Sequence, residues 1–133
     1  MYQRTVLIVE DEPLIRMILA DAVEDEGYSV LEAGTALEAI AILGHHQVNA
    51  VITDVDMPGA LNGLDLAKFI HLSMRTLPVI VTSAGRDGAD CSLPGEALFI
   101  PKPYPLACMI GSLNSVLEAD PNARKPGNSV RAA

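Results

Sequence analysis

Charged or hydroxyl side chains come directly after four of the short apolar runs of this sequence. In chain order they are Glu10-Asp11-Glu12, Asp54 with Asp56, Ser83 and Lys102. Three carboxylates in one cleft, those of Glu10, Asp11 and Asp54, would repel one another at neutral pH unless protonated or neutralised. Mg²⁺ removes that repulsion, since it accepts a few carboxylates, water and a phosphoryl oxygen as ligands. It also masks the charge of an incoming phosphate, so that a carboxylate can attack phosphorus. These residues predict a magnesium site suited to phosphoryl transfer.

These groups meet only if the apolar runs are the strands of one parallel sheet. Apolar runs and helical patterns alternate five times, and the predicted strands are residues 6–9, 29–33, 50–53, 79–82 and 97–100. The predicted helices are residues 14–26, 35–44, 64–73 and 106–118. Continuously apolar strands are typical of a parallel sheet that is covered on both faces. The fold class is therefore α/β, a doubly wound open sheet, in which ligands bind outside the carboxyl ends of the strands.

Local signals place the ends of two helices. Gly27 is a natural cap at the carboxyl end of the first helix. Thr35 and Glu38 have capping-box spacing, which predicts that Thr35 begins the second helix and that the Glu38 side chain reaches back.

Residues 84–96 interrupt the pattern. This segment contains Gly85, Gly88, Pro94 and Gly95, and its apolar residues lack helical periodicity. Glycine costs about 1 kcal/mol and proline about 3 kcal/mol inside a helix. We expect the fourth helix to be short, irregular or missing.

Composition narrows the classes of function. The chain has 133 residues, half of them hydrophobic, and a net charge of −8, with all seventeen acidic residues at or before Asp120. Such a body repels nucleic acid and anionic membranes. No apolar run is long enough to span a bilayer, and we expect no signal peptide. Cys91 and Cys108 lack the spacing of a zinc or redox site. We expect a cytoplasmic protein with one domain over residues 1–119, a flexible tail over 120–133 and no effector domain.

The motifs resemble the receiver domain of two-component response regulators over about residues 4–118. Five motifs match in order, namely residues 6–13 (VLIVEDEP), residues 53–58 (TDVDMP), Gly63, residues 78–84 (PVIVTSA) and residues 99–104 (FIPKPY). The resemblance implies a flavodoxin-like sheet with strand order 2-1-3-4-5. It also implies a phosphorelay function, in which Asp54 takes a phosphoryl group from a sensor histidine kinase or a histidine phosphotransfer protein.

The resemblance also implies a role for each residue of the site. Asp11, Asp54 and the backbone carbonyl of Asp56 would bind Mg²⁺, with Glu10 acting through water. Lys102 would pair with the phosphoryl oxygens, and Ser83 would be drawn toward them by a hydrogen bond. Phe99 corresponds to an aromatic switch beneath the output face, and the Lys102–Pro103 peptide bond is expected to be cis. The side chain of Asp56 is expected to be solvated.

The chain departs from the family pattern near its output face. The segment from Pro58 to Gly63 holds one extra residue, and the segment from Ser83 to Lys102 is shorter than usual. The downstream protein target, the use of that face and a homodimer through it therefore remain open. Output would come from protein–protein contacts.

Three other classes of function compete with this interpretation. A receiver-like adaptor that works without phosphorylation usually lacks an acceptor, an acid or the lysine, and none is lost here. An aspartate-nucleophile phosphohydrolase would place its Asp-x-Asp after the first strand, whereas Asp54 and Asp56 follow the third. A flavodoxin-like nucleotide binder needs a first loop that welcomes phosphate, and Glu10-Asp11-Glu12 would repel it.

Overall fold

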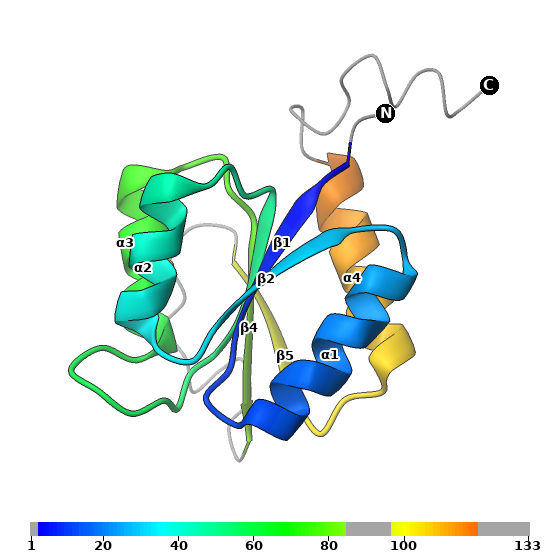
Figure 1. Cartoon of the computed structure of the whole chain (residues 1–133), viewed down its shortest axis with the longest axis horizontal. Coiled ribbons are helices and arrows are strands. Elements are labelled where there is room, and N and C mark those ends of the chain that lie inside the picture. The colour runs from blue at the N-terminus through cyan, green and yellow to red at the C-terminus, as the bar shows by residue number, and fades with distance from the viewer. Residues whose placement is uncertain (1–2, 85–96, 120–133) are drawn as a thin grey trace.

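The computed structural model describes residues 3–84 and 97–119, which form one parallel sheet with helices on both faces. The sheet has the strand order β2-β1-β3-β4-β5, which is the order that the resemblance implies (Figure 1). Its strands are β1 (Thr5–Val9), β2 (Ser29–Ala33), β3 (Ala50–Asp54), β4 (Val79–Ala84) and β5 (Leu98–Lys102). All four neighbouring pairs are parallel, so their carboxyl ends share one edge of the molecule.

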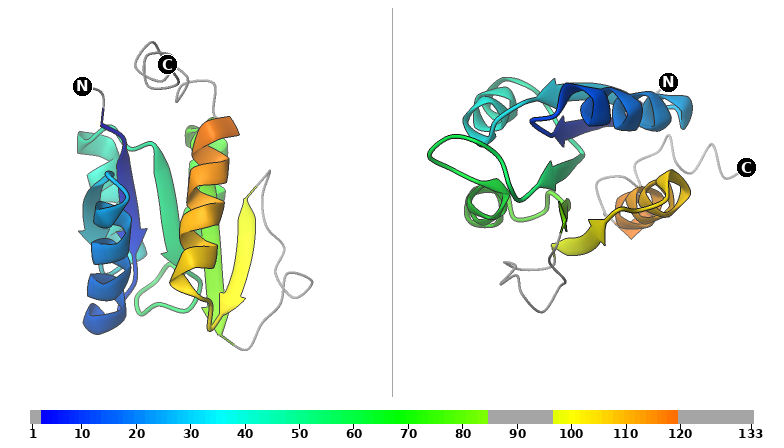
Figure 2. Two further views of the ribbon diagram at one scale, coloured as in Figure 1. Left: turned by 90° about the vertical axis from the view of Figure 1, so that its right-hand side faces the viewer. Right: turned by 90° about the horizontal axis from the view of Figure 1, so that it is seen from below.

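In the described ranges, two helices cover each face of the sheet. The helices are α1 (Pro13–Asp25), α2 (Ala36–His45), α3 (Gly63–Ser73) and α4 (Leu106–Ala119). Helices α1 and α4 lie on one face, and α2 and α3 lie on the other (Figures 1 and 2). Helix α1 begins at Pro13 because proline lacks an amide hydrogen and suits the first helical turn. After its end, Gly27 has a φ of 100°, a conformation that glycine adopts without strain.

The predicted cap of α2 is present with one difference. The Thr35 side chain accepts a hydrogen bond from the amide of Glu38, as expected. The Glu38 carboxylate, however, accepts from the amide of Gly34 at 2.6 Å, one residue before the cap. The helix start is still fixed by both side chains.

Alternation along the strands sorts the core into two layers. Leu7 and Val9 of β1 join the apolar cluster beneath α2 and α3, whereas Val6 and Ile8 join the cluster beneath α1 and α4. Side chains of a strand alternate between the two faces of a sheet. The same alternation directs Glu10, Asp54 and Lys102 toward the α1/α4 face, because they extend the rows of Ile8, Ile52 and Ile100.

The strands at one side of the sheet run further than the sequence predicts. β4 continues through Ser83 and Ala84, and β5 continues through Pro101 and Lys102, because these residues still pair across the two strands. Pro101 fits in β5, which pairs only with β4 among the described strands. The expectations for a short or irregular fourth helix and for a flexible tail fall on residues 85–96 and 120–133, outside the described residues. In the part of the chain that is described, no helix is long and apolar enough to cross a bilayer.

Candidate functional site

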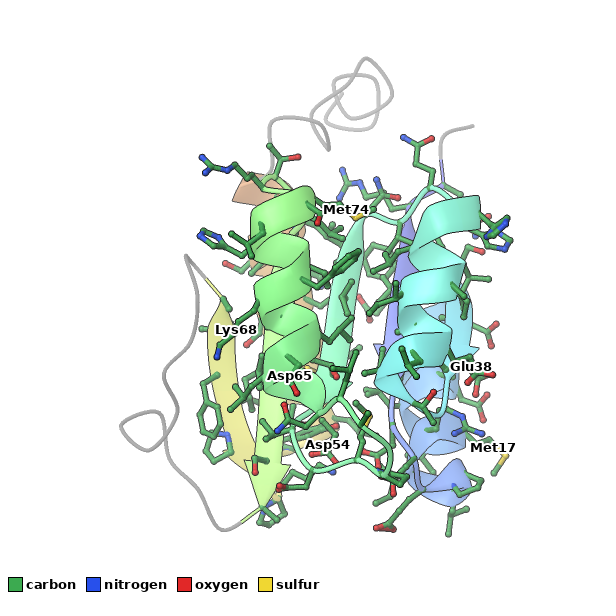
Figure 3. All side chains as sticks on the ribbon, turned by 90° about the vertical axis from the view of Figure 1, so that its left-hand side faces the viewer. Met17, Glu38, Asp54, Asp65, Lys68 and Met74 are labelled. Carbon is green, nitrogen blue, oxygen red and sulfur yellow. The ribbon has the colours of Figure 1, made fainter. Side chains whose placement is uncertain are left out.

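Three side chains at the carboxyl ends of separate strands meet at one edge of the sheet. The Lys102 Nζ lies 2.9 Å from a carboxylate oxygen of Glu10 and 3.4 Å from one of Asp54. All three side chains are largely buried, with exposed fractions of 18% for Lys102, 6% for Glu10 and 9% for Asp54. Figure 3 shows Asp54 at this edge, beside the start of α3. The sheet thus brings together an ammonium group and two carboxylates that are distant in sequence.

Carboxylates at this edge have the arrangement of a cation site. Glu10, Asp11 and Asp54 each offer a carboxylate oxygen, and these oxygens lie within 4.8 Å of one another. Glu10 and Asp54 are buried, so they cannot spread apart into water to relieve their repulsion. Hard oxygen donors in a cluster of this size are suited to Mg²⁺. The residues that the sequence assigned to Mg²⁺ through their side chains therefore fit that ion.

Burial and the charge of Lys102 have opposite effects on the pKa values of Glu10 and Asp54. Burial raises the pKa of Glu10 above its usual value, and the Lys102 ammonium only partly offsets this. Burial likewise raises the pKa of Asp54, against the lowering effect of Lys102. For Lys102, burial favours the neutral amine, but the hydrogen bond to Glu10 and the charge of Asp54 outweigh it and raise the pKa. The site therefore favours the charged form of Lys102, but this one positive charge does not offset the effect of burial on the pKa values of Glu10 and Asp54.

This imbalance predicts how Asp54 affects stability as the pH changes. Because the folded-state pKa of Asp54 exceeds its reference value of 3.8, the folded state retains the proton longer than the unfolded state. The contribution of Asp54 to the free energy of unfolding is thus fully present below pH 3.8 and is lost as the pH rises through the pKa of Asp54 in the folded state. We expect Asp54→Asn to become progressively more stable than the unaltered protein above that pH. Urea unfolding of both proteins in EDTA from pH 4 to 8 measures this, and a flat or opposite difference would contradict the pKa direction.

A glycine lets helix α3 approach the backbone of β3 closely. The amide of Gly63 donates to the carbonyl oxygen of Val55 at 2.9 Å. A Cβ atom at Gly63 would lie 1.9 Å from the carbonyl oxygen of Asp54, far inside van der Waals contact. The approach therefore requires glycine, and it fixes where the β3–α3 loop leaves the sheet.

The start of α3 is held by a capping box that the sequence reading missed. The Asn62 side chain accepts from the amides of Leu64 and Asp65, and the Asp65 carboxylate accepts from the amide of Asn62. The signal was present, because Asn62 and Asp65 have the spacing of a capping box. These bonds anchor the turn that carries Gly63.

Arg16 of α1 supports the acidic loop from outside and was also missed. One guanidinium nitrogen donates to the carbonyl oxygen of Glu10 at 2.6 Å, and another lies 3.2 Å from a carboxylate oxygen of Glu32. The amide of Glu12 donates to the Glu10 carboxylate at 3.2 Å. Glu10 is thereby oriented toward Lys102 by both its backbone and its side chain. No sequence pattern singles out a lone arginine for this role.

Ser83 contacts the second acid of the Asp54 loop. Its side chain is fully buried, and its hydroxyl donates to a carboxylate oxygen of Asp56 at 3.0 Å. Asp56 is exposed, as expected, but its carboxylate also contacts Ser83, which the sequence did not indicate. Phe99 is partly buried against the α2/α3 layer and is in register with Val81, two residues before Ser83. The expected cis bond between Lys102 and Pro103 is confirmed.

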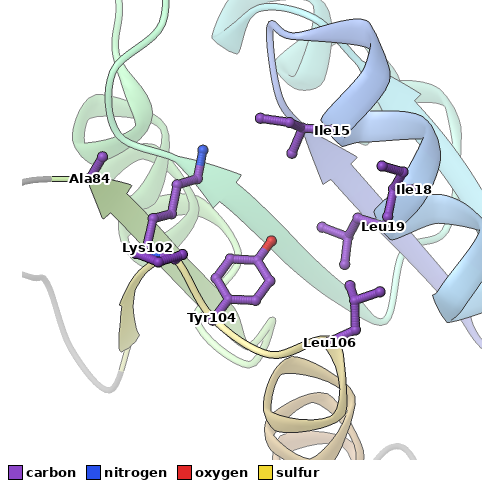
Figure 4. Close-up of a pocket in the computed structure, with 8 residues that line it drawn as sticks. Ile15, Ile18, Leu19, Ala84, Lys102, Tyr104 and Leu106 are labelled. Carbon is purple, nitrogen blue, oxygen red and sulfur yellow. The ribbon is translucent and has the colours of Figure 1, made fainter.

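An apolar pocket opens beside Lys102. It has a volume of about 460 Å³ and lies between α1, the ends of β4 and β5, and the start of α4 (Figure 4). Its lining residues are Ile15, Ile18, Leu19, Ala84, Lys102, Pro103, Tyr104 and Leu106. The Tyr104 ring is largely buried there, and this burial raises the pKa of its hydroxyl. Two of the lining residues, Ile18 and Leu106, are exposed, and Leu14 and Met17 of α1 are exposed apolar residues as well.

Comparisons with known proteins agree with the fold and with the motifs. The family model of the response regulator receiver domain matches residues 6–113. The transcriptional regulatory protein PdtaR of Mycobacterium tuberculosis is 38% identical over 114 residues, which cover 83% of this chain and 55% of PdtaR. The aerobic respiration control protein ArcA of Escherichia coli is 36% identical over 103 residues, covering 74% of this chain and 42% of ArcA. The chain thus spans about half the length of these curated relatives.

Solved structures show the same architecture. The receiver protein from Sinorhizobium medicae superposes with a TM-score of 0.82 at 21% identity, covering 89% of this chain and 97% of that one. The receiver domain protein from Methanospirillum hungatei gives a TM-score of 0.80 at 21% identity, covering 90% of this chain and 97% of that one.

Proposed function

Because the chain belongs to the response regulator receiver domain family of two-component signalling, we propose that Asp54 is its phosphoacceptor. The observation that carries the proposal is the setting of the Asp54 carboxylate, which lies 3.4 Å from the Lys102 ammonium and shares a three-carboxylate cluster with Glu10 and Asp11. A nucleophile, a fixed positive charge and hard oxygen donors for a metal are the parts that phosphoryl transfer to a carboxylate requires.

The transfer exchanges one bond to phosphorus for another. A carboxylate oxygen of Asp54 forms the new P–O bond while the P–N bond of a phosphohistidine breaks, and the electron pair of that bond returns to the imidazole. Lys102, already beside Asp54, moves with little rearrangement onto the phosphoryl oxygens. Its ammonium suits this task as a compact charge with three donors.

The acidic cluster supplies ligands for a metal ion, whose positive charge adds to that of Lys102. We propose that Asp11, Asp54 and the backbone carbonyl of Asp56 hold Mg²⁺, with Glu10 contributing through water. Bound there, Mg²⁺ supplies charge neutralisation for the phosphoryl oxygens and for the crowded acids. Arg16 and the amide of Glu12 hold Glu10 in place for this role.

Mass spectrometry of the intact protein tests the acceptor and the metal together. We expect incubation with acetyl phosphate and Mg²⁺ to add one phosphoryl group, and EDTA to reduce the yield at least about tenfold, because the metal neutralises both reactants. Asp54→Asn is the matched control, since it keeps the size of the side chain and removes the nucleophile. An adduct of equal yield in that variant, or in EDTA, would overturn the assignment.

The partner that delivers the phosphoryl group must cover this edge of the sheet. We propose that a sensor histidine kinase or a histidine phosphotransfer protein docks on the exposed apolar residues of α1 and the start of α4. Leu14, Ile18 and Leu106 are exposed by 64%, 46% and 40%, respectively, and the latter two line the pocket that leads to Lys102. A phosphohistidine presented over these residues arrives beside Asp54. We place this exchange in the cytoplasm, with a protein target downstream and no chemistry on other substrates.

The mass experiment also separates the competing functions. A receiver-like adaptor gives no adduct from acetyl phosphate or from a phosphorylated kinase. An aspartate-nucleophile phosphohydrolase would release phosphate continuously from a small phosphoester. Neither is favoured. The adaptor is not, because Lys102 pairs with Glu10 and Asp54, and carboxylate oxygens of Glu10, Asp11 and Asp54 lie within 4.8 Å of one another. The phosphohydrolase is not, because Asp54 and Asp56 lie at the end of β3 rather than of β1. The division into a receiver domain at 1–119 and a tail at 120–133 stays part of this proposal.

A further inference from the structure

We infer that the Asp56 side chain is a positioning residue, which latches Ser83 in the unphosphorylated protein and releases it when Asp54 is phosphorylated. The inference rests on the proposed function and adds a residue whose side chain had no assigned role. It begins from one contact, the 3.0 Å hydrogen bond from the Ser83 hydroxyl to a carboxylate oxygen of Asp56.

The hydroxyl has only one proton to donate. Ser83 is fully buried, and its second acceptor within reach is the carbonyl oxygen of Ala84 at 3.3 Å. The bond to the exposed Asp56 is shorter than the contact with Ala84 and goes to a carboxylate oxygen, and hydrogen bonds to carboxylates are roughly twice as strong as those between neutral groups. The resting orientation of Ser83 is therefore set chiefly by Asp56.

Phosphorylation presents the same proton with a competing acceptor. A phosphoryl group on Asp54 places anionic oxygens two residues from Asp56, at the edge where β3 and β4 end side by side. Ser83 can donate to a phosphoryl oxygen only by leaving the Asp56 carboxylate. The two positions exchange one anionic acceptor for another, so their free energies are close and a single group can tip the balance.

The hydrogen bond to Asp56 therefore helps to set the equilibrium between the resting and the switched position of Ser83. Removing its carboxylate removes the acceptor of the resting position while the phosphoryl acceptor remains. Losing one hydrogen bond to a charged group changes such an equilibrium by roughly tenfold or more. The resting protein would then populate the switched position of Ser83 before phosphorylation, and a phosphoryl mimic would bind more tightly.

A double-mutant cycle separates the latch from simple charge removal. Beryllium fluoride with Mg²⁺, a tetrahedral phosphoryl mimic, is titrated by calorimetry into the unaltered protein, Asp56→Ala, Ser83→Ala and the double variant. We expect Asp56→Ala to tighten binding about tenfold when Ser83 is present and less than about twofold when it is absent. Equal tightening in both backgrounds would mean that only the lost negative charge matters, and would overturn the latch. Asp56→Asn, which keeps a neutral acceptor, should tighten binding by a smaller factor.

A second measurement needs neither metal nor mimic. Three-bond NMR couplings of the Ser83 β-protons report its χ1 rotamer in the metal-free protein. We expect one rotamer in the unaltered chain and averaging in Asp56→Ala, and averaging in the unaltered chain would overturn the latch. Failure of every variant to bind beryllium fluoride would instead count against the phosphoacceptor assignment, while the rotamer result would still decide the latch.

Discussion

Replacing Lys102 by methionine should lower the rate of phosphorylation by acetyl phosphate about 100-fold or more. The Lys102 ammonium is a charged donor already aimed at Asp54, 3.4 Å from its carboxylate. Removing one preorganised donor at the point where charge develops costs roughly 10²–10³ in rate. Methionine preserves length and apolar packing, so the change removes the charge and little else. The measurement is the initial rate of adduct formation at saturating Mg²⁺.

Lys68 offers a matched control for this variant. It is an exposed lysine on α3, away from the acidic edge (Figure 3). Lys68→Met changes the net charge of the protein by the same amount, and we expect its rate to stay within about twofold of the unaltered protein, as exposed charges contribute little. If Lys102→Met also stayed within a few-fold, Lys102 would be a structural counter-charge for Glu10 rather than part of the transfer.

Replacing Gly63 by alanine should destabilise the protein by about 3 kcal/mol or more, the upper end of the usual cost of overpacking. The new Cβ would meet backbone atoms of Asp54 and Val55 at 1.9 to 2.9 Å, and these belong to the central strand and its exit. A flexible side chain could move aside, but this backbone is held by the bond from Gly63 to Val55 and by the pairing of Val55 with Thr82. The free energy of urea unfolding measures the effect.

At Gly111, the same substitution by alanine is expected to have the opposite effect on stability. It lies within α4, and a Cβ there meets nothing within 4 Å. Gly111→Ala should therefore stabilise the protein by about 0.5–1 kcal/mol, the usual gain for alanine over glycine in a helix. A Gly63→Ala protein within 1 kcal/mol of the unaltered one would show that α3 can retreat from Asp54 at little cost.

The strands that carry the site could be predicted from the sequence, because buried strands and the parallel arrangement follow regular patterns. Apolar runs located all five strands, and the parallel arrangement brings their carboxyl ends together, so the meeting of Glu10, Asp54 and Lys102 followed from order alone. The errors lie at the strand ends. β4 and β5 extend past their apolar residues because backbone pairing continues through Ser83 and Pro101, whatever their side chains.

The supporting contacts were beyond sequence reasoning, apart from the Asn62–Asp65 cap. Arg16 reaches the backbone of Glu10, and Ser83 reaches the side chain of Asp56, across elements whose packing distance no local pattern fixes. The metal ligands, the acceptor and the pairing of Ser83 and Phe99 with the switch remain predictions about roles. The structure supplies their neighbours, and the experiments above test what they do.

The position of β3 in the sheet determines which parts of the site can open locally without unfolding the whole molecule. β3 is buried along its whole length and is paired on both sides, whereas β5 is paired only with β4 among the described strands. Elements with dense contacts open only with the whole fold, and those at an edge open locally at much lower cost. Asp54 thus lies on a strand that opens only with the whole fold, while Lys102 lies on the edge strand β5, which can open locally. The proposed nucleophile is therefore held on a strand that is paired on both sides, and the lysine that would follow the phosphoryl group lies on a strand whose local opening costs less.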